Sequence, residues 1–302
     1  MNNRSKAAVI DIGSNSIRYM EAELKDGLVF SKGHRLITVR LATNLNSAEV
    51  LSGKAAGRLA PDRMDAAIEA IGEFAETAKK SGLPVFAYAT SAVRDAANRD
   101  EFLHLVKAET GVEIDVLSGE REAEYAFTAV NSDGLIDIGG GSTQIITAES
   151  GVSFPLGCVR CKDMFSSITD LNELRKTVSG RLSPMLAETF TAKPLVVEPS
   201  AKWCGVGGTI TTLGGLAAGI TEYSHGIVDG VELTLDTLPK LIQSLHDMGD
   251  EKRREHPLLK KRHDIILYGA LILETEMRFL GINKITVSEK DGMDGYFKYR
   301  VN

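Results

Sequence analysis

Short apolar runs alternate along the chain with segments in which apolar residues recur every three or four positions. The apolar runs lie at 7–13, 84–90 and 112–117, and small or polar residues follow each of them, as is typical of buried strands. A last strand is expected at 284–289. The helical pattern covers the segments 62–81, 98–111, 120–130, 235–245 and 262–280. This alternation predicts an α/β protein.

One strand-and-turn pattern occurs twice. The hexapeptide DIGSNS at 11–16 is echoed by DIGGGS at 137–142, and each follows an apolar strand and precedes a second extended run. After the first copy, the run 17–24 meets a Lys-Asp-Gly turn at 25–27, which predicts a hairpin. A third glycine cluster, GVGGT at 205–209, precedes a helical segment. The internal similarity predicts two related lobes that face one cleft.

The composition narrows the possible functions. A chain of 302 residues is long enough for one large domain or two, and 43% hydrophobic and 25% charged residues are ordinary for a globular protein. The net charge of −6 argues against a general nucleic-acid binder, so any bound polyanion must be held by local cations and backbone amides. No run of eighteen apolar residues and no signal-peptide core occurs, so we expect a cytoplasmic protein without a membrane partner.

The three cysteines are too few for a disulfide scaffold, which suits a reducing cytosol. Cys158 and Cys161 form a C-x-x-C, but no second pair and no neighbouring histidine completes a metal-binding pattern. The six histidines show no metal-ligand spacing either. Cysteine and histidine chemistry is therefore not part of the functional hypothesis.

The repeated turns have the composition of anion-binding loops. Gly, Ser and Asn let consecutive backbone N–H groups converge on an anion, because no bulky side chain blocks its approach. Two opposed loops can hold successive phosphates, and the carboxylates of Asp11 and Asp137 can hold Mg²⁺ through water. The alternative is that each loop is only a hairpin turn with a capping aspartate. The residues that add side-chain donors are Ser14, Asn15, Ser16, Ser142 and Thr143.

Neither loop is a Walker A or a Rossmann motif, because G-x-x-x-x-G-K-[ST] is absent and the segment after each turn is extended. The pattern instead resembles the phosphate loops of the actin, sugar kinase and heat-shock ATPase superfamily, which is marked by a duplicated strand–turn–strand. This resemblance implies an actin-like α/β fold with two ribonuclease H-like lobes and an interdomain cleft. We expect lobe one at 1–124, completed by the C-terminal strand and residues 286–302, and lobe two at 125–285.

Longer segments resemble one family within this superfamily, the exopolyphosphatase and guanosine pentaphosphate phosphatase family. The resemblance covers essentially the whole chain in the family's order. The segments that carry it are DIGSNSIR (11–18), ATSAVRDAAN (89–98), LSGEREAEYAF (117–127), DIGGGSTQ (137–144), GVGGTITTL (205–213), RHDII (262–266) and VSEKDGMDG (287–295).

The resemblance implies an active site for the hydrolysis of phosphoanhydrides. Glu122 is the implied general base and Arg94 the implied phosphate-binding arginine, with Arg40 and Arg160 as weaker candidates. Mg²⁺ is the implied cofactor, and Asp11 and Asp137 are its implied ligands. The positions implied to bind phosphate are Gly13, Ser14, Asn15, Ser16, Arg18, Gly139, Gly140, Gly141, Ser142, Thr143, Gly207, Gly208 and Thr209.

Three departures from the family pattern bear on activity. Gln144 stands where the family usually has Glu, so we expect weaker metal binding or weaker orientation of water. Met293 stands where the family often has Arg. The helical C-terminal extension of the long family members does not follow the end motif, so we expect short polyphosphates or guanosine pentaphosphate to be favoured over long chains.

The leading hypothesis is Mg²⁺-dependent hydrolysis of the terminal phosphate of inorganic polyphosphate. One alternative is removal of the 5′-phosphate from guanosine pentaphosphate. A second is a catalytically weak polyphosphate or nucleotide sensor, suggested by Gln144, and a third is an ATP-dependent kinase of the same superfamily. We expect no nucleic-acid partner, and the sequence leaves open whether the protein is a monomer or a homodimer.

Overall fold

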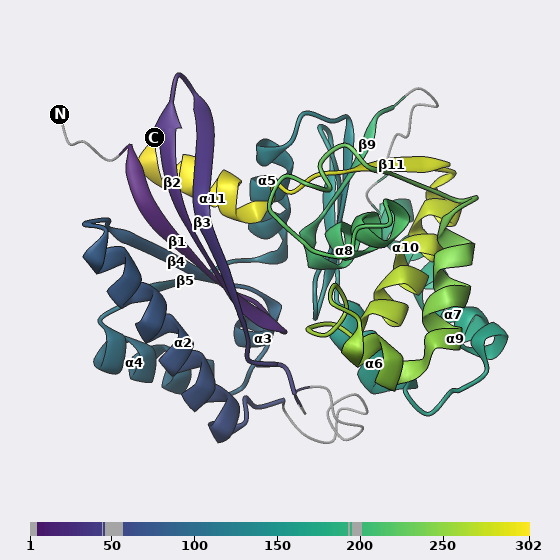
Figure 1. Cartoon of the computed structure of the whole chain (residues 1–302), viewed down its shortest axis with the longest axis horizontal. Coiled ribbons are helices and arrows are strands. Elements are labelled where there is room, and N and C mark those ends of the chain that lie inside the picture. Colours follow the sequence, from purple (N-terminus) through teal and green to yellow (C-terminus); the bar gives the residue numbers. More distant parts are fainter. Residues whose placement is uncertain (1–4, 44, 46–56, 193, 195–200) are drawn as a thin grey trace. The chain divides into compact units, whose positions relative to one another are not determined.

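The computed structural model describes residues 5–43, 45, 57–192, 194 and 201–302. The chain forms two compact units, drawn in Figure 1. The first comprises Met1–Ala129 and Gly292–Asn302, and the second comprises Val130–Asp291. The chain passes between the units after Ala129 and after Asp291. The boundaries expected from the sequence, after residues 124 and 285, lie a few residues earlier.

The first unit is built on a five-stranded sheet. Its strands are β1 (Lys6–Ile12), β2 (Ser16–Lys25), β3 (Leu28–Thr38), β4 (Val85–Ala89) and β5 (Ile114–Val116), in the order β3-β2-β1-β4-β5. The first three strands form an antiparallel meander, and β4 and β5 continue the sheet in parallel with β1. The predicted hairpin is confirmed, because Asp26 and Gly27 take positive φ angles of 50° and 76°, as a two-residue turn between twisted strands requires.

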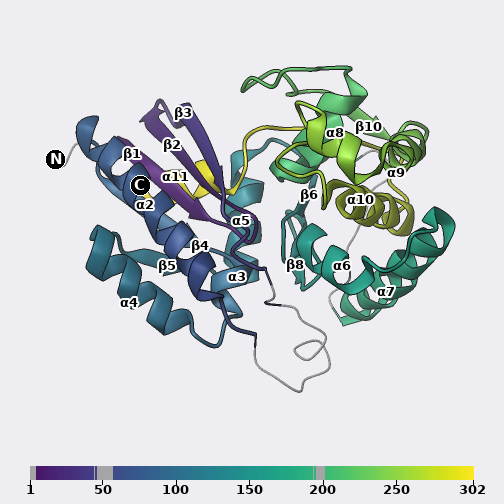
Figure 2. The same ribbon diagram turned by 60° about the horizontal axis from the view of Figure 1, so that its bottom comes forward.

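Helices cover both faces of this sheet, as Figure 1 and Figure 2 show. They are α2 (Pro61–Lys80), α3 (Ser91–Arg94), α4 (Arg99–Thr110), α5 (Gly119–Ala129) and α11 (Gly292–Val301). On one face, Val9 of β1 packs in a cluster with Tyr125 of α5 and Tyr296 of α11. On the other face, the ring of Tyr19 stacks on Phe74 of α2. Side chains at alternate strand positions thus pack against two separate layers of helices.

The second unit is built on a six-stranded sheet. Its strands are β6 (Gly134–Ile138), β7 (Thr143–Thr147), β8 (Gly151–Phe154), β9 (Trp203–Val206), β10 (Glu232–Thr234) and β11 (Lys284–Val287), in the order β10-β11-β9-β6-β7-β8. Strands β6, β7 and β8 form an antiparallel meander, β9 runs parallel to β6, and β11 runs parallel to β9. Strand β10 is added antiparallel at the edge.

The core of the second unit is centred on one helix that is buried over most of its length. The helices of the unit are α6 (Cys158–Phe165), α7 (Leu171–Ala192), α8 (Gly207–Ala217), α9 (Leu238–Glu255) and α10 (Ile266–Leu280). Helix α10 is buried from Ile266 to Met277 and packs against the other four. Its first half, Ile266–Leu273, is apolar on all sides and must be enclosed, which explains why the neighbouring helices surround it.

The two sheets share one topology. The order β8-β7-β6-β9-β11 repeats β3-β2-β1-β4-β5 strand for strand, with the same parallel and antiparallel pairings. The DIGSNS and DIGGGS turns therefore occupy the same place, between the first two strands of each sheet. The predicted fold class is confirmed: the chain is an α/β protein in which one mixed-sheet topology occurs twice, once in each unit.

The C-terminal segment differs from the expectation. Strand β11 pairs with β9 and β10 in the second unit, so the prediction that the last strand completes lobe one is wrong. Helix α11 completes the first unit instead. The sequence did not predict this helix, because Gly292 and Gly295 are poor helix formers. Its side chains Met293, Tyr296 and Phe297 are buried in the core of the first unit, and this packing outweighs the weak propensity.

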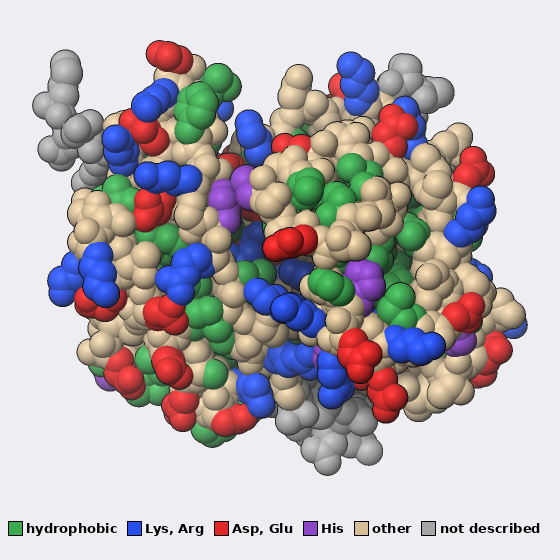
Figure 3. Space-filling model, viewed as in Figure 1, with side chains coloured by type: hydrophobic (Ala, Val, Ile, Leu, Met, Phe, Trp, Pro, Cys, Tyr) green, Lys and Arg blue, Asp and Glu red, His purple; other side chains and the backbone are tan. Residues whose placement is uncertain are grey.

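Large apolar side chains are exposed at the tip of the β2–β3 hairpin. Leu28 and Phe30 are 59% and 55% exposed, and Figure 3 shows hydrophobic side chains gathered at this tip. Toward the left and right margins of the face drawn there, acidic and basic side chains are intermingled. Within the described part of the chain, no helix combines the length and the apolar character needed to cross a membrane.

A single methyl group at Gly134 tests how tightly β6 packs on β9. A Cβ there would lie 2.6 Å from the ring of Trp203, which is the Cα partner of Gly134 and is buried. We expect Gly134→Ala to lower the free energy of unfolding by about 1–3 kcal/mol in urea denaturation. The control Gly180→Ala, in α7, adds a Cβ that meets no atom within 4 Å and should raise it by about 0.5–1 kcal/mol. A neutral Gly134→Ala would contradict the close packing.

Candidate functional site

The loops after parallel strands lie side by side at one edge of the first sheet. Strand β1 leads into the DIGSNS loop, β4 into α3, and β5 into α5. The N–H of Thr90 donates to the Ile12 carbonyl (3.2 Å), and the N–H of Leu117 donates to the Ala89 carbonyl (2.9 Å). Ligands of open α/β sheets bind at such carboxyl edges. The predicted residues of the first unit therefore share one edge.

The backbone of the first loop turns its N–H groups to one side. The Gly13 N–H donates to the Ser16 carbonyl (3.1 Å) and closes the turn. The carbonyls of Ser14 and Asn15 accept hydrogen bonds of 2.8–3.1 Å from the segment 39–42. Because N–H and C=O point in opposite directions across a trans peptide, the N–H groups of Asn15 and Ser16 point away from that segment. Consecutive N–H groups on one side are what an anion-binding loop requires.

The side chains of this loop are buried and bond to neighbours. Ser14 Oγ lies 3.0 Å from Ser91 Oγ at the start of α3, and Asn15 Nδ2 donates to Ser16 Oγ (3.1 Å). All three loop side chains are less than a tenth exposed. They hold the loop in place, and the anion-binding capacity lies mainly with the backbone.

Arg18 and Asp11 form an ion pair with each other. They are Cα partners on β2 and β1, and Arg18 Nε and Nη2 lie 2.8 and 2.5 Å from Asp11 Oδ2. Asp11 is buried, so the guanidinium balances a charge that little water reaches. The sequence predicted Arg18 as a phosphate ligand and Asp11 as a metal ligand. A phosphate or a metal ion has to compete with this pair.

Arg94 and Glu122 are brought into contact. Arg94 ends α3, and its Nη1 donates to the Leu117 carbonyl (2.9 Å) and to Glu122 Oε2 (3.3 Å). Glu122 lies in the first turn of α5, where its N–H donates to the Ser118 carbonyl (3.0 Å). The two side chains are 23% and 14% exposed. The implied base and the implied phosphate-binding arginine are thus one hydrogen bond apart.

The DIGGGS loop of the second unit repeats the geometry of the first. The Gly139 N–H donates to the Ser142 carbonyl (3.0 Å). The Gly139 and Gly140 carbonyls accept bonds of 2.8–3.2 Å from the first residues of α6. By the same peptide geometry, the N–H groups of Gly140 and Gly141 point away from α6. Each unit therefore carries a turn of one design, whose backbone N–H groups are placed as an anion would require.

Three other predicted side chains stand in different surroundings. Thr143 is fully buried, and its hydroxyl donates to a carbonyl in the β8–α6 connection (2.7 Å), so it supports the fold. The backbone N–H groups of Arg40 and Arg160 donate to the Asn15 and Gly140 carbonyls, at 2.8 and 3.2 Å. Each of these guanidinium groups therefore extends from a residue that touches a phosphate loop.

The third glycine segment forms the first turn of α8. No side-chain cap bond satisfies this helix end in the described structure, so the N–H groups of Gly207, Gly208 and Thr209 suit an anion. Gly207 has φ +82°, and a Cβ there would overlap Asp137 Oδ1. The carboxylate of Asp137 therefore lies against a helix N-terminus, which favours its negative charge. The Thr209 side chain is buried, so this residue offers its backbone.

Arg262 is a site residue to which the sequence assigned no role. A Cβ on Gly208 would overlap the Arg262 guanidinium, so this cation lies over the first turn of α8. The segment RHDII carries part of the family resemblance, which implies no role for its arginine. Because Lys260 and Lys261 precede Arg262, nothing local distinguishes it from surface charge. Only the folded chain shows which of the three cations reaches a glycine loop.

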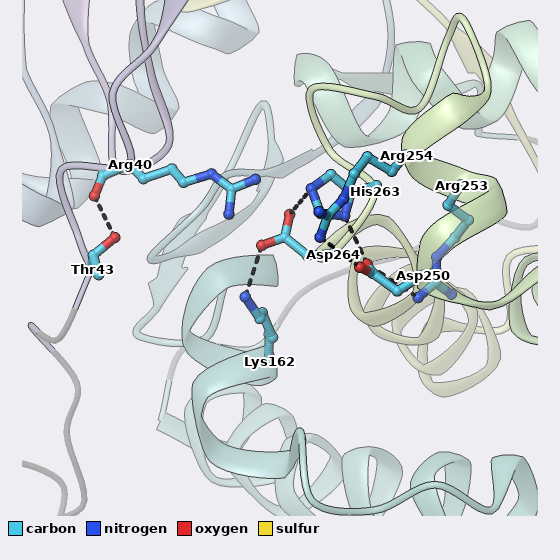
Figure 4. Close-up of polar contacts among 8 residues, drawn as sticks. All are labelled: Arg40, Thr43, Lys162, Asp250, Arg253, Arg254, His263 and Asp264. Carbon is cyan, nitrogen blue, oxygen red and sulfur yellow. Dashed lines mark hydrogen bonds and ion pairs between the residues drawn. The ribbon is translucent and has the colours of Figure 1, made fainter.

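A charged network fixes the chain around Arg262 (Figure 4). Lys162 of α6 donates to Asp264 (2.7 Å), and His263 Nδ1 lies 2.7 Å from Asp250 Oδ1 on α9. Figure 4 shows His263 between the two carboxylates. Burial alone would raise the pKa of Asp250, but hydrogen bonds and charges from His263 and a neighbouring arginine bring that pKa below its usual value. The network joins α6, α9 and the segment before α10.

Two buried side chains associated with Asp137 carry oxygen atoms that have no hydrogen-bond partner among the described residues. Gln144 is the Cα partner of Asp137, and its Nε2 donates to Ser142 Oγ (3.0 Å) and Ser153 Oγ (3.1 Å), whereas its Oε1 has no such partner. Glu276 of α10 is fully buried, and neither of its carboxyl oxygens has a hydrogen-bond partner among the described residues. Burial and the negative charge of Asp137 raise the pKa of Glu276 well above its usual value.

The two thiols of the C-x-x-C motif are inaccessible. Cys158 and Cys161 are 1% and 0% exposed, and burial raises the pKa of both thiols. A buried thiol with a raised pKa is a poor nucleophile and a poor metal ligand. No cluster of three or more His, Cys, Asp or Glu placed to hold a metal occurs in the described part of the chain. A bound metal would therefore keep much of its water shell.

Comparisons with known proteins agree on one family. Residues 25–296 match the model of the Ppx/GppA phosphatase family. Exopolyphosphatase 2 of Mycobacterium tuberculosis is 31% identical over 323 residues, covering 96% of this chain and 97% of the relative. A crystal structure of the Aquifex aeolicus Ppx/GppA family member has a TM-score of 0.76 at 28% identity, covering 98% and 97% of the two chains. An exopolyphosphatase structure from Cytophaga hutchinsonii, at 21% identity and TM-score 0.83 over 98% and 97%, shows the same fold.

The raised pKa of Glu276 makes stability depend on pH. The folded state holds this proton more tightly than the unfolded state, so the stability it gives is present in acid and is lost as pH rises above the usual glutamate pKa. We expect Glu276→Gln to be more stable than the parent protein at pH 8, with a smaller difference at pH 5, in urea denaturation without metal. The control Glu274→Gln, on the same helix, breaks ion pairs with Arg175 and Arg278 and should lose stability at both pH values. A difference that does not change with pH would refute the assignment.

Proposed function

The chain belongs to the Ppx/GppA phosphatase family, and on this basis we propose that it removes the terminal phosphate from inorganic polyphosphate by hydrolysis of a phosphoanhydride bond. The name of its mycobacterial relative, similar over nearly the full length of both chains, supports this substrate. Polyphosphate is a linear polyanion with many equivalent phosphates. The backbone loops of both units suit such a ligand, because they bind phosphate without reading any other group.

The contact between Arg94 and Glu122 is the observation on which the proposal rests. Glu122 can accept a proton from water, and Arg94 can bind phosphoryl oxygens with its planar fork. Their side chains are 3.3 Å apart and both are partly buried. A base and a phosphate-binding cation in contact are the two groups that attack of water on a phosphorus atom needs.

In the proposed reaction, a water molecule attacks the terminal phosphorus atom. Glu122 takes a proton from this water as the new P–O bond forms, and the bond from phosphorus to the bridging oxygen breaks. The products are inorganic phosphate and a chain that is one phosphate shorter, and the proton on Glu122 passes to solvent. Arg94 and the N–H groups of Asn15 and Ser16 bind the non-bridging oxygens, over which negative charge is spread in the transition state.

The loops of the second unit are also proposed to bind phosphate groups. Their donors are the N–H groups of Gly140 and Gly141, the first turn of α8, and the Arg262 guanidinium beside Gly208. Arg18 is a weaker candidate than Arg94, because two of its nitrogen atoms lie 2.5–2.8 Å from Asp11 Oδ2, whereas Arg94 contacts Glu122 through one nitrogen at 3.3 Å. In a protein with a net charge of −6, these local donors must overcome the overall repulsion of a polyanion.

Mg²⁺ fits the oxygen donors around Asp137. A carboxylate and the amide oxygen of Gln144, which lacks a hydrogen-bond partner in the described structure, are hard ligands of the kind this ion prefers. Asp11 fits less well, since Arg18 occupies its Oδ2. When bound, the ion would neutralise charge on phosphate oxygens. Asp137 and Gln144 would hold it from β6 and β7.

The role of Glu122 is tested by a change that keeps its shape and removes its basicity. We expect Glu122→Gln to lower kcat for short polyphosphate by about 100- to 10,000-fold, because a neutral amide cannot accept the proton from water. Phosphate release with Mg²⁺ measures this. The matched control is Glu120→Gln, the same substitution at an exposed position of the same helix, which should keep the parent rate. A Glu122→Gln variant with the parent rate would exclude Glu122 as the base.

The same assay identifies the substrate when short polyphosphate, long polyphosphate, guanosine pentaphosphate and ATP are run in parallel. We expect release from polyphosphate to be fastest. Faster release from guanosine pentaphosphate would replace the proposed substrate and keep the reaction. Tight binding of polyphosphate without release from any of the four would make the protein a sensor.

The position of Gln144 predicts how a carboxylate would act there. Gln144→Glu places a second carboxyl group opposite Asp137 in a buried site. We expect the melting temperature of this variant to fall without metal, because a buried carboxylate at position 144 would be repelled by that of Asp137, and to rise more than that of the parent protein when Mg²⁺ is added. Calorimetry with and without Mg²⁺ measures both effects. An equal response of the two proteins to Mg²⁺ would place the metal elsewhere.

A further inference from the structure

Helix α5 presents different sides to two neighbours. Glu122 contacts Arg94. Arg121 and Tyr125, one turn apart and therefore on one side of the helix, contact α11. The orientation of α5 sets the position of Glu122, so whatever fixes the Arg121–Tyr125 side also fixes the carboxylate.

The side toward α11 is held by a cation that contacts two aromatic rings. The Arg121 guanidinium lies 5.2 Å from the ring centre of Tyr125 and 4.9 Å from that of Tyr299. Its Nη2 also donates to the Tyr125 hydroxyl (2.7 Å). The two tyrosine rings are 5.3 Å apart, and Tyr299 is 56% exposed. An exposed tyrosine that covers an arginine adds little to the core, yet it restrains the rotation of α5.

The two helices also touch backbone to backbone. A Cβ on Gly295 would overlap the Tyr125 carbonyl oxygen and would lie 2.9 Å from Thr128 Oγ1. No other residue type fits this crossing without moving one helix. The glycine that weakens α11 as a helix is therefore the residue that lets it seat against α5.

Helix α11 is anchored in turn to the strands that lead into the Arg94–Glu122 pair. The Tyr296 hydroxyl lies 3.2 Å from the Ala87 carbonyl of β4 and 2.5 Å from Asp115 Oδ2 of β5. Arg300 also bonds to Asp115. Strand β4 leads to α3 and Arg94, and β5 leads to α5 and Glu122. Helix α11 thus contacts both the strand that leads to Arg94 and the strand that leads to Glu122.

We propose that α11 is a positioning element for the catalytic carboxylate: Gly295 and the Arg121–Tyr299 stack hold α5 so that Glu122 stays within reach of Arg94 and water. This inference rests on the proposed function of Glu122. A displacement of about 1 Å at a reacting group can cost about 100-fold in rate. Gly295, Arg121 and Tyr299 touch none of the reacting atoms, so they act only through the position of α5.

The test compares changes on α11 in two backgrounds. In the parent protein, Tyr299→Ala and Gly295→Ala should lower kcat for short polyphosphate by about 10- to 100-fold and leave KM within about twofold, since phosphate binding is untouched. Tyr299→Phe keeps the ring and should retain most of kcat. The control Phe74→Leu loosens the opposite face of the same sheet and should lower the melting temperature while kcat at 25 °C stays near that of the parent.

The decisive measurement adds Tyr299→Ala to Glu122→Gln. If Tyr299 acts through Glu122, the substitution has no further effect on the residual rate of Glu122→Gln. A further 10- to 100-fold loss in that background, or an unchanged kcat in the parent background, would overturn the positioning role and leave the proposed function intact. Full activity of Glu122→Gln itself would overturn both.

Discussion

One hydrogen bond, made twice, underlies the chemistry proposed for this protein. The N–H of Gly13 donates to the Ser16 carbonyl, and the N–H of Gly139 donates to the Ser142 carbonyl. Each bond closes a turn so tightly that a Cβ on the glycine would press on the accepting oxygen, at 3.1 Å. With the turn closed, the neighbouring carbonyls bond to an adjacent segment, and the next two N–H groups are left on the opposite side.

The two copies of this turn have diverged in charge. Register across the first hairpin pairs Asp11 with Arg18, and register across the second pairs Asp137 with Gln144. The first carboxylate is therefore balanced by a guanidinium, whereas the second faces a neutral amide and lies against the N-terminus of α8. The same arrangement therefore has two charge states. In the first unit the charge of Asp11 is neutralised by Arg18, whereas in the second unit Asp137 can attract a cation.

The features that could be predicted from the sequence are those set by a few neighbouring residues. Glycine-rich turns after apolar strands are recognisable locally, and so were the hairpin and the duplication. Glu122 lies between Glu120 and Glu124 and reads alone as a solvated helix residue, so only the family resemblance singled it out. The pairing of residue 11 with 18 was accessible from hairpin register. The position of Arg262 and the docking of α11 depend on long-range packing, which neither charge pattern nor propensity reveals.

The second unit is one continuous stretch inserted between α5 and α11, two helices that pack on each other in the first unit. This connectivity has a consequence for biosynthesis. Because domains fold as units while the chain emerges, the inserted half can finish folding before the half that encloses it. The half that contains Glu122 lacks one of its helices until α11 has left the ribosome. Phosphatase chemistry would then be withheld from any chain that stops short of α11.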